Sequence, residues 1–220
     1  FILGPSHLFS FPYCSIPNAN SAESPYGSIP FDISACEYLL NQFPKLFKPM
    51  DVSIASIEHS LEMEFPLLKY IFKTKPFSII PIIVGSISYN TCKEIAKSLS
   101  RYADDSRTLF VISSDFCHWG KRFGYQYLPQ GNDLKIFQRI EKLDRMGADA
   151  IALGDPEKFK QYLDETGNTI CGRNPILIMM NLFKDKSVSA TFPSYSQSEN
   201  ITSMSDSSVS YYAGIITIDE

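Results

Sequence analysis

Two short apolar runs with a helical pattern between them limit what this chain can fold into. Residues 77–84 and 108–112 are apolar and rich in β-branched side chains, which is typical of strands covered on both faces. Between them, Ile95, Ala96 and Leu99 recur at helical spacing. Because strands and helices alternate, we predict a layered α/β fold, with a central, mostly parallel or mixed sheet flanked by helices.

The length and composition fit one domain. The chain has 220 residues, of which 44% are hydrophobic, enough to bury one sizeable core. No internal repeat or linker divides it, so we predict a single domain over residues 1–220. Residues 1–3 read as a buried strand, and the chain opens directly on it. We therefore expect that an N-terminal segment is missing.

Prolines shape our predictions for the first third of the chain. Residues 8–30 contain four of them and are predicted to form a long loop. From Glu58 to Phe72, apolar residues recur at three- and four-residue spacing, which predicts one helix kinked by Pro66 near its middle.

Helix signals are clearer in the second half. Residues 133–146 carry a helical stripe that is expected to stop at Gly147, a residue favoured just after a helix. A second helix is predicted from Asp155 to Gly167, and a third after Asn174-Pro175. Alternating residues from 209 to 218 predict a final strand or hairpin.

Charge and cysteine content exclude several classes of protein. Lys and Arg number 20 against 24 Asp and Glu, and no basic block stands out, so we expect no nucleic-acid partner. The longest apolar stretches fall short of the roughly 20 residues that span a bilayer, so no membrane insertion is expected. Five cysteines without a close pair argue against a disulfide framework or a zinc ribbon, and indicate a cytoplasmic location.

Histidine is scarce enough to weigh each residue. His7 follows the first predicted strand, and ligands of open α/β sheets bind beyond the carboxyl ends of strands. A ligand or catalytic role and a structural role are both open for it. The signal from His59, beside Glu58 and Ser60, is weak: it fits a residue near a ligand or an ordinary helix start.

A second polar group follows the strand at 108–112. Asp115 and His118 occupy the position that His7 has after the first strand, and Trp119 lies next to them. A carboxylate near an imidazole can fix the tautomer, as a general acid or base requires. The alternative is a loop in which Asp115 caps its own backbone and His118 packs against Trp119.

Cys171 lies just ahead of a predicted helix, with Arg173 nearby. The positive end of a helix dipole and a guanidinium both favour the thiolate, which binds metals or reacts. Free cysteines are nevertheless often small buried hydrophobes, so the reactive and inert interpretations of Cys171 both stand.

Taken together, the motifs resemble the Memo family. They follow that family's order over nearly the whole chain: FILGPSH at 1–7, SPYGSIPFD at 24–32, EHSLEME at 58–64, SSDFCHWG at 113–120, TICGR at 169–173 and DSSVSYYAG at 206–214. The family is similar in fold to the class III extradiol dioxygenases, which hold non-haem iron with two histidines and a glutamate.

The resemblance implies roles for particular residues. His7 matches a metal ligand, Cys171 stands at the position of the carboxylate ligand, and His118, with Asp115 beside it, matches the acid–base histidine. Glu58, His59, Arg173 and Trp119 would surround the metal or contact the ligand. A soft thiolate in place of a carboxylate favours copper or zinc over reactive iron. The family's other ligand histidine lies in a PHAGY-type motif, which this sequence lacks.

These implications lead to one main function and two alternatives. We expect a cytosolic Memo-like protein with a vestigial dioxygenase site that binds copper or iron, or that acts in signalling and cell motility through protein partners. The first alternative is a phosphotyrosine-peptide module without metal, in which Arg173 holds the phosphate. The second, ranked lower, is an active dioxygenase. A hydrolase based on Ser114, Asp115 and His118 ranks below these because no GxSxG motif is present.

Two further expectations concern the site itself. His7, Asp115, His118 and Cys171 are predicted to line one crevice. Ring cleavage is not expected, because Cys171 replaces a carboxylate and one ligand histidine is missing.

Overall fold

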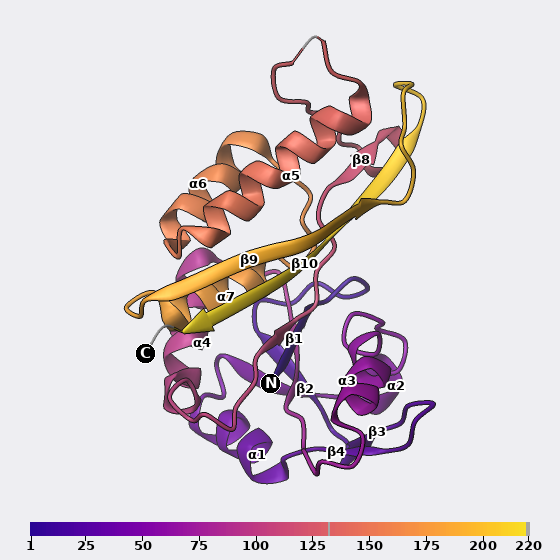
Figure 1. The fold of residues 1–220 in the computed structure, drawn as a ribbon. Helices are drawn as coiled ribbons and strands as arrows, with labels where there is room; N and C mark the ends of the chain where they lie inside the picture. Colours follow the sequence, from indigo (N-terminus) through magenta and orange to yellow (C-terminus); the bar gives the residue numbers. More distant parts are fainter. Residues whose placement is uncertain (132, 219–220) are drawn as a thin grey trace. The chain divides into compact units, whose positions relative to one another are not determined.

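The structure is a computed structural model that describes residues 1–131 and 133–218. The chain divides into two compact units (Figure 1). The first unit comprises Phe1–Ser113 and Asn174–Leu182, and the second comprises Ser114–Arg173 and Phe183–Glu220. The prediction of one domain over residues 1–220 stays a prediction.

A five-stranded mixed sheet forms the centre of the first unit. Its strand order is β5-β2-β6-β1-β7. Strand β1 is parallel to both β6 and β7, whereas β2 is parallel to β5 and antiparallel to β6. The strands are β1 (Ile2–Pro5), β2 (Cys14–Pro17), β5 (Phe47–Met50), β6 (Pro81–Val84) and β7 (Val111–Ile112). The predicted central mixed sheet is confirmed.

Strands β1 and β6 are the most deeply buried part of this sheet. All four residues of each are buried, and the register pairs Ile2 with Pro81 and Pro5 with Val84. Both sequences are short and almost wholly apolar, as expected for strands covered on both faces. The predictions of strands at the chain start and within 77–84 are therefore confirmed.

The prediction of a long loop over residues 8–30 is wrong in part. This segment contains β2 and a small antiparallel pair, β3 (Ser21–Ala22) with β4 (Ile29–Pro30). Proline is excluded from the interior of a central strand because it lacks an N–H, but Pro17 falls at the last position of β2. Cys14, Ser15 and Ile16 keep their donors, so they can pair with neighbouring strands.

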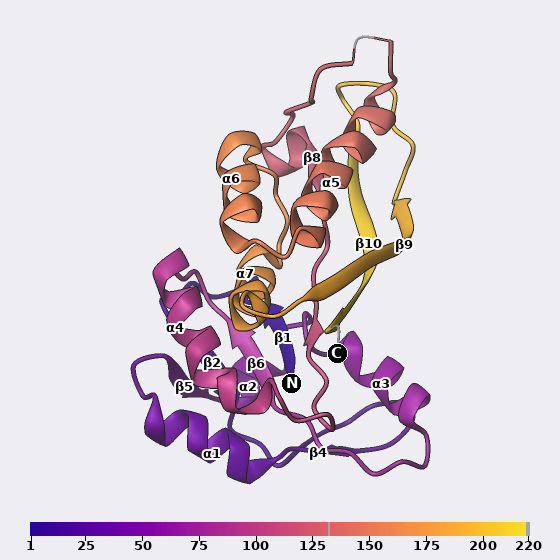
Figure 2. The same ribbon diagram turned by 60° about the vertical axis from the view of Figure 1, so that its left-hand side comes forward.

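Helices lie on both sides of the sheet in the first unit. Figures 1 and 2 show α3 on the side opposite to α1 and α4. The Asp32 side chain caps α1 by accepting the Ala35 N–H, and Ser88 caps α4 in the same way through Thr91. The helices of this unit are α1 (Ile33–Gln42), α2 (Val52–Ala55), α3 (Glu64–Phe72), α4 (Tyr89–Leu99) and most of α7 (Arg173–Phe183), with a 3₁₀ turn at Ser100–Tyr102.

The single kinked helix predicted from Glu58 to Phe72 is wrong. Residues 58–63 are not helical, and α3 begins only at Glu64. Pro66 is therefore in the first turn, where backbone N–H groups have no partner within the helix and proline is tolerated. The apolar spacing in 58–63 continues the helical pattern, but Leu61 reaches the core from an irregular segment.

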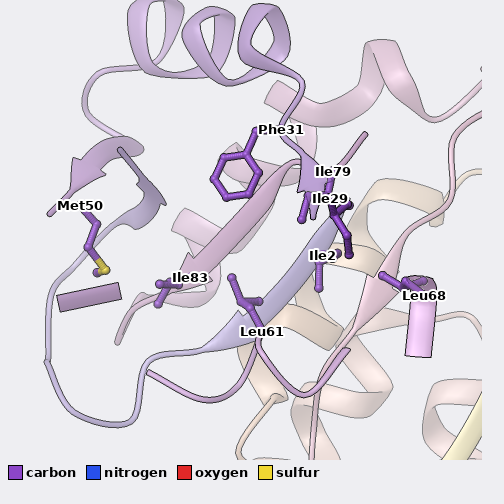
Figure 3. Close-up of a cluster of buried hydrophobic side chains, with 8 residues drawn as sticks. All are labelled: Ile2, Ile29, Phe31, Met50, Leu61, Leu68, Ile79 and Ile83. Atoms are coloured by element: carbon purple, nitrogen blue, oxygen red, sulfur yellow. The ribbon is translucent and has the colours of Figure 1, made fainter. Parts of the chain in front are cut away.

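A cluster of buried side chains joins these elements (Figure 3). It combines residues of the sheet with residues of the segments that cover one face of it. The members are Ile2, Ile29, Phe31, Met50, Leu61, Leu68, Ile79 and Ile83. Leu61 thus holds residues 58–63 against the sheet, next to the residues that follow β1.

The second unit is built from an antiparallel sheet and two helices. Its strand order is β8-β10-β9, with β8 (His118–Gly120), β9 (Val188–Gln197) and β10 (Ser207–Ile218). The helices are α5 (Ile136–Ala152) and α6 (Pro156–Thr166), and a 3₁₀ turn covers Lys121–Phe123. Helix α5 packs against α6 and β9 (Figure 2). The predicted final strand is confirmed as β10, which pairs with β9 from the Ser-rich region before it. The helix capped by Asp155 and Gly167 is also confirmed.

The prediction that a helix ends at Gly147 is wrong, because α5 continues through this residue to Ala152. A side chain at position 147 would meet the Tyr162 ring at 2.9–3.0 Å. Glycine is therefore present here so that α6 can approach α5 closely, not because the helix stops.

No helix in the described part of the chain has both the length and the apolar character needed to cross a membrane.

Replacing Ile83 with alanine tests the core of the first unit. Ile83 is only 2% exposed, so truncation should leave a cavity and lower the free energy of unfolding by roughly 2–5 kcal/mol. Ile71→Ala is the matched control: its side chain on α3 is 69% exposed, and the change should stay within about 0.5 kcal/mol. Urea unfolding followed by circular dichroism measures both. Equal losses would contradict the assignment of Ile83 to the core.

Candidate functional site

His7 follows β1 and is held by a single carboxylate. Its backbone N–H donates to Oε2 of Glu58 at 2.6 Å, and its ring Nδ1 lies 2.9 Å from Oε1. One side chain thereby fixes both the backbone and the ring of His7. The strand end and the segment 58–63 are brought together although they are 51 residues apart in sequence.

Glu58 is buried and ionised. Its Oε1 also accepts the backbone N–H groups of His59 at 3.0 Å and Ser60 at 3.4 Å. Burial raises the pKa of this carboxyl, but the hydrogen bonds from the side chain and backbone of His7 outweigh burial and lower the pKa below its ordinary value. The carboxylate is therefore negatively charged at neutral pH.

The charge of Glu58 sets the tautomer of His7. An ionised carboxylate can only accept, so Nδ1 of His7 carries the proton and donates it. The ring lone pair is then on Nε2. Histidine ligands of metals are commonly oriented in this way, with one ring nitrogen on a carboxylate and the other on the metal.

His59 completes this first cluster. Its ring stacks on that of His7 with centroids 4.5 Å apart and planes 16° apart, and its Nδ1 lies 3.7 Å from Oε1 of Glu58. The potential ligand atoms of His7, Glu58 and His59 all lie within 4.8 Å of one another. These three residues could hold a metal ion. The sequence signal for His59 is weak because stacking between distant segments is not visible in a sequence.

Gly4 allows the two segments to approach. A Cβ at this position of β1 would lie 2.7 Å from Oγ of Ser60 and 2.9 Å from Cδ2 of Leu61. Any side chain would push residues 58–61 off the strand. The glycine of the FILGPSH motif thus has a structural reason, because it lets Glu58 reach His7.

A second cluster, in the second unit, contains Asp115, His118 and Cys171. Nδ1 of His118 lies 3.1 Å from the carbonyl oxygen of Phe116, and since a carbonyl can only accept, Nδ1 carries the proton. The basic Nε2 then lies 3.7 Å from Oδ2 of Asp115. This arrangement suits proton transfer, because Nε2 can take up a proton and form an ion pair with Asp115.

The segment that carries these residues is held rigidly. Four consecutive backbone N–H groups, from residue 115 to residue 118, each donate to a partner distant in sequence. In chain order the acceptors are the thiol of Cys171 at 3.1 Å, the carbonyl of Ser210 at 2.8 Å, the carboxylate of Asp144 at 3.2 Å and the hydroxyl of Thr169 at 2.7 Å. Side chains supply three of the four, so the segment is fixed by specific residues, not by a regular ladder. His118 itself is the first residue of β8.

Cys171 is half-buried and adjoins Asp115. Its Sγ accepts the Asp115 N–H and lies 3.7 Å from the carbonyl oxygen of the same residue. The helix that follows begins at Arg173 with Gly172 as its N-cap, not after Asn174 as predicted. The N-cap has no side-chain hydrogen bond, and the Gly172 N–H donates to Oγ of Ser114 at 3.0 Å.

The remaining predicted site residues have clear positions. Trp119 is fully buried, and its indole N–H donates to the carbonyl of Tyr127 at 3.0 Å, whereas Arg173 is exposed at the start of α7.

His7, Glu58 and His59 belong to the first unit, and Asp115, His118 and Cys171 belong to the second. The prediction that both groups line one crevice therefore stays a prediction.

Sequence reasoning missed Asp144. This residue of α5 is 0% exposed and accepts four hydrogen bonds: from the Cys117 N–H, the Asn168 amide, the Tyr195 hydroxyl and the Ser210 hydroxyl. Burial raises its pKa to about 6, although these donors oppose the shift. An acidic residue on the apolar face of a predicted helix was the only available signal.

The fold and the two clusters define a mixed α/β protein in which histidine, carboxylate and thiol groups gather in two clusters. The family model described as Memo-like protein matches residues 1–215, and the chain belongs to this family. Protein memo-1 homolog from Caenorhabditis elegans is 37% identical over 224 residues, covering 99% of this chain and 63% of that protein. This chain therefore spans less than two thirds of that relative. Protein MEMO1 from Homo sapiens is 36% identical over 227 residues, covering 99% of this chain and 75% of that protein.

One solved structure supports the fold independently. The crystal structure of the uncharacterized protein JW3007 from Escherichia coli K12 matches with a TM-score of 0.55, covering 95% of this chain and 84% of its own. At 13% sequence identity this likeness concerns the fold alone.

Asp144 predicts a specific pH dependence of stability. The folded protein binds the Asp144 proton more tightly than the unfolded chain does, because the pKa is about 6 when folded and 3.8 ordinarily. The stabilisation is fully present below pH 3.8 and is lost as the pH rises through 6. It amounts to roughly 3 kcal/mol.

Asp144→Asn lacks this proton. Relative to Asp144→Asn, the wild type should therefore lose roughly 3 kcal/mol of unfolding free energy as the pH rises from about 4 to about 7. Urea titrations at a series of pH values measure it. A difference that is constant across this range would contradict the raised pKa.

Proposed function

We propose that this Memo family chain binds a transition metal of the copper or iron class. His7 would bind through Nε2 and His59 through a ring nitrogen. A thiolate ligand from Cys171 is what the family resemblance implies. The observation that carries the proposal is the hydrogen bond from Nδ1 of His7 to the ionised carboxylate of Glu58. This contact leaves the lone pair on Nε2 and orients the ring, as carboxylates do for the histidine ligands of established metal sites.

The donor set fits such a metal. Imidazole nitrogen and thiolate sulfur are borderline and soft donors, which suit copper, zinc and iron, whereas magnesium and calcium require several oxygen ligands. Oε1 of Glu58 already accepts hydrogen bonds from three N–H groups, so this carboxylate serves better as an orienting group than as a ligand. When bound, a metal of this kind supplies one-electron redox chemistry or Lewis-acid polarisation.

We assign proton transfer to His118. Nδ1 of this residue is used by the Phe116 carbonyl, so Nε2 is the atom that accepts or releases a proton, and Asp115 stabilises the charged ring. The proposal thus combines a metal held by histidine and cysteine with a separate acid–base residue. It does not require that the protein is an enzyme.

Partner binding is a secondary proposal. Arg173 is exposed at the first position of α7, and its N-cap is a glycine. A guanidinium beside the N–H groups of a helix start suits a phosphate, including that of a phosphotyrosine peptide in a signalling partner. We rank this below metal binding because it rests on one side chain and one helix start.

Metal affinity of variants tests the main proposal. Glu58→Gln should weaken binding roughly 10–100-fold. Both oxygens of Glu58 accept hydrogen bonds from His7, one from the backbone and one from the ring, and an amide keeps only one accepting oxygen. His7→Ala and Cys171→Ser, which remove ligand atoms, should cost at least as much. Glu62→Gln is the matched control, since it neutralises an exposed acid in the same segment and should leave the affinity unchanged.

The measurement is competition with chromophoric chelators for Cu(I) and Fe(II) under anaerobic conditions. If His7→Ala bound either metal as tightly as the wild type, the metal would be held elsewhere. If Cys171→Ser alone were unaffected, the first cluster would be sufficient without the thiolate.

Ring cleavage should not occur. By the family resemblance, Cys171 stands where extradiol dioxygenases carry a carboxylate, and a thiolate disfavours the oxygen-rich coordination of reactive Fe(II). Protein loaded with Fe(II) without oxygen, then given catechol or protocatechuate and air, should yield no coloured ring-opened product by absorbance. Turnover that is abolished in His118→Ala would overturn this prediction.

A further inference from the structure

Asp144 lies in the protein interior, where a carboxylate lowers the stability of the fold. It is 0% exposed on α5, and burying an ionisable group costs free energy unless hydrogen bonds compensate. Four donors from four different parts of the second unit converge on it. An apolar residue of similar size would fill the same space without this cost, so the position calls for a functional explanation.

The two oxygens of Asp144 have different partners. Oδ1 accepts the Cys117 N–H at 3.2 Å and the Asn168 side-chain amide at 3.1 Å. Oδ2 accepts the hydroxyl groups of Tyr195 and Ser210. Oδ1 therefore faces the segments that carry the acid–base cluster, whereas Oδ2 faces β9 and β10.

One peptide group connects Asp144 to His118. The Cys117 N–H belongs to the same planar unit as the Phe116 carbonyl, and the two point in opposite directions because the peptide is trans. Oδ1 of Asp144 holds the N–H side of this plane, and Nδ1 of His118 donates to the carbonyl side at 3.1 Å. Rotation of the peptide would break both hydrogen bonds at once.

Oδ1 also contacts the second segment of the cluster, residues 168–171, through Asn168. Asn168 directly precedes Thr169, whose hydroxyl accepts the His118 N–H at 2.7 Å and donates to the His118 carbonyl at 3.0 Å. Cys171 follows two residues later and accepts the Asp115 N–H. A single carboxylate oxygen thus ties together the two segments that carry Asp115, His118 and Cys171.

We propose that Asp144 is a positioning residue for His118, acting through the peptide between Phe116 and Cys117. We call the Asp144 carboxylate, this peptide and the His118 ring the relay. The carboxylate orients the peptide and, by polarising it, strengthens the carbonyl as an acceptor for the proton on Nδ1. His118 is thereby kept in the tautomer that presents Nε2 as a base. This inference rests on the acid–base role of His118 in the proposed function.

Apart from His118, which exchanges a proton in the proposed function, Asp144 is the group around this peptide that changes charge near neutral pH. Tyr195 on β9, Tyr212 on β10, Tyr162 on α6, Tyr125 and the Cys117 thiol lie in its electrostatic field, and burial raises the pKa of each. All five stay neutral in the physiological range, and Ser210 and Asn168 do not ionise. The Cys117 amide should therefore report on the charge of Asp144.

Nitrogen NMR of the metal-free full chain tests the relay without depending on metal binding. Long-range proton–nitrogen spectra distinguish the two His118 tautomers. Wild type should show Nδ1–H, and Asp144→Ala, which removes the acceptor, should give a mixture of tautomers. Asp144→Asn keeps an amide oxygen for the Cys117 N–H, so it should restore the wild-type tautomer.

Tyr195→Phe separates positioning from general loosening. It removes a donor from Oδ2 but leaves the contact between Oδ1 and Cys117, so it should destabilise the protein and keep the tautomer unchanged. The inference is wrong if Asp144→Ala leaves the tautomer unaltered, or if Tyr195→Phe disturbs it as strongly.

A second measurement decides the matter if Asp144→Ala does not fold. In His118→Gln, which removes proton exchange by His118 next to this peptide, the Cys117 amide resonance should still shift in one step near pH 6. Adding Asp144→Asn should remove this step. A His118→Gln amide without the step, or a double variant that retains it, overturns the relay. Since no metal is added, failure here leaves the metal affinities untouched, and failure of metal binding leaves the relay standing.

Discussion

The parallel pairing of β1 between β6 and β7 is the constraint on which the first unit depends. Its four residues are buried, and the chain leaves the sheet at the carboxyl end of this strand, which His7 follows. The same strand accepts the 58–61 segment over Gly4, because nothing larger than hydrogen fits there. The position of His7 and that of its carboxylate partner thus both follow from one short apolar strand.

The fold class could be predicted because its signals are local. The apolar strands, the caps at Asp32 and Asp155, and the left-handed Gly167 each depend on neighbours in sequence. Errors arose where a local pattern has two physical explanations. Gly147 fits a helix end or a close helix contact, and only the Tyr162 ring from α6 decides between them.

The candidate site was predictable as a list of residues but not as a set of contacts. The pattern of polar residues after predicted strands correctly indicated that His7 follows β1 and Asp115 follows β7, whereas His118 opens β8. Strand β7 is only partly buried, not buried as predicted. The orienting role of Glu58 depends on a contact across 51 residues, and that of Asp144 depends on Cys117, 27 residues away. Such contacts are created by tertiary packing, so no periodicity or motif in the chain encodes them visibly.

The two clusters fix the tautomer of a histidine in two different ways. In each, an imidazole donates through Nδ1 and keeps Nε2 as the basic nitrogen, but Glu58 contacts His7 directly whereas Asp144 reaches His118 through a peptide. The N–H donors around Glu58, led by His7, lower its pKa, so its charge is permanent at neutral pH. Around Asp144 deeper burial outweighs the donors and raises the pKa to about 6. A constant charge suits the fixed tautomer of a metal ligand, and a charge that changes near neutral pH suits a residue that must both take up and release a proton.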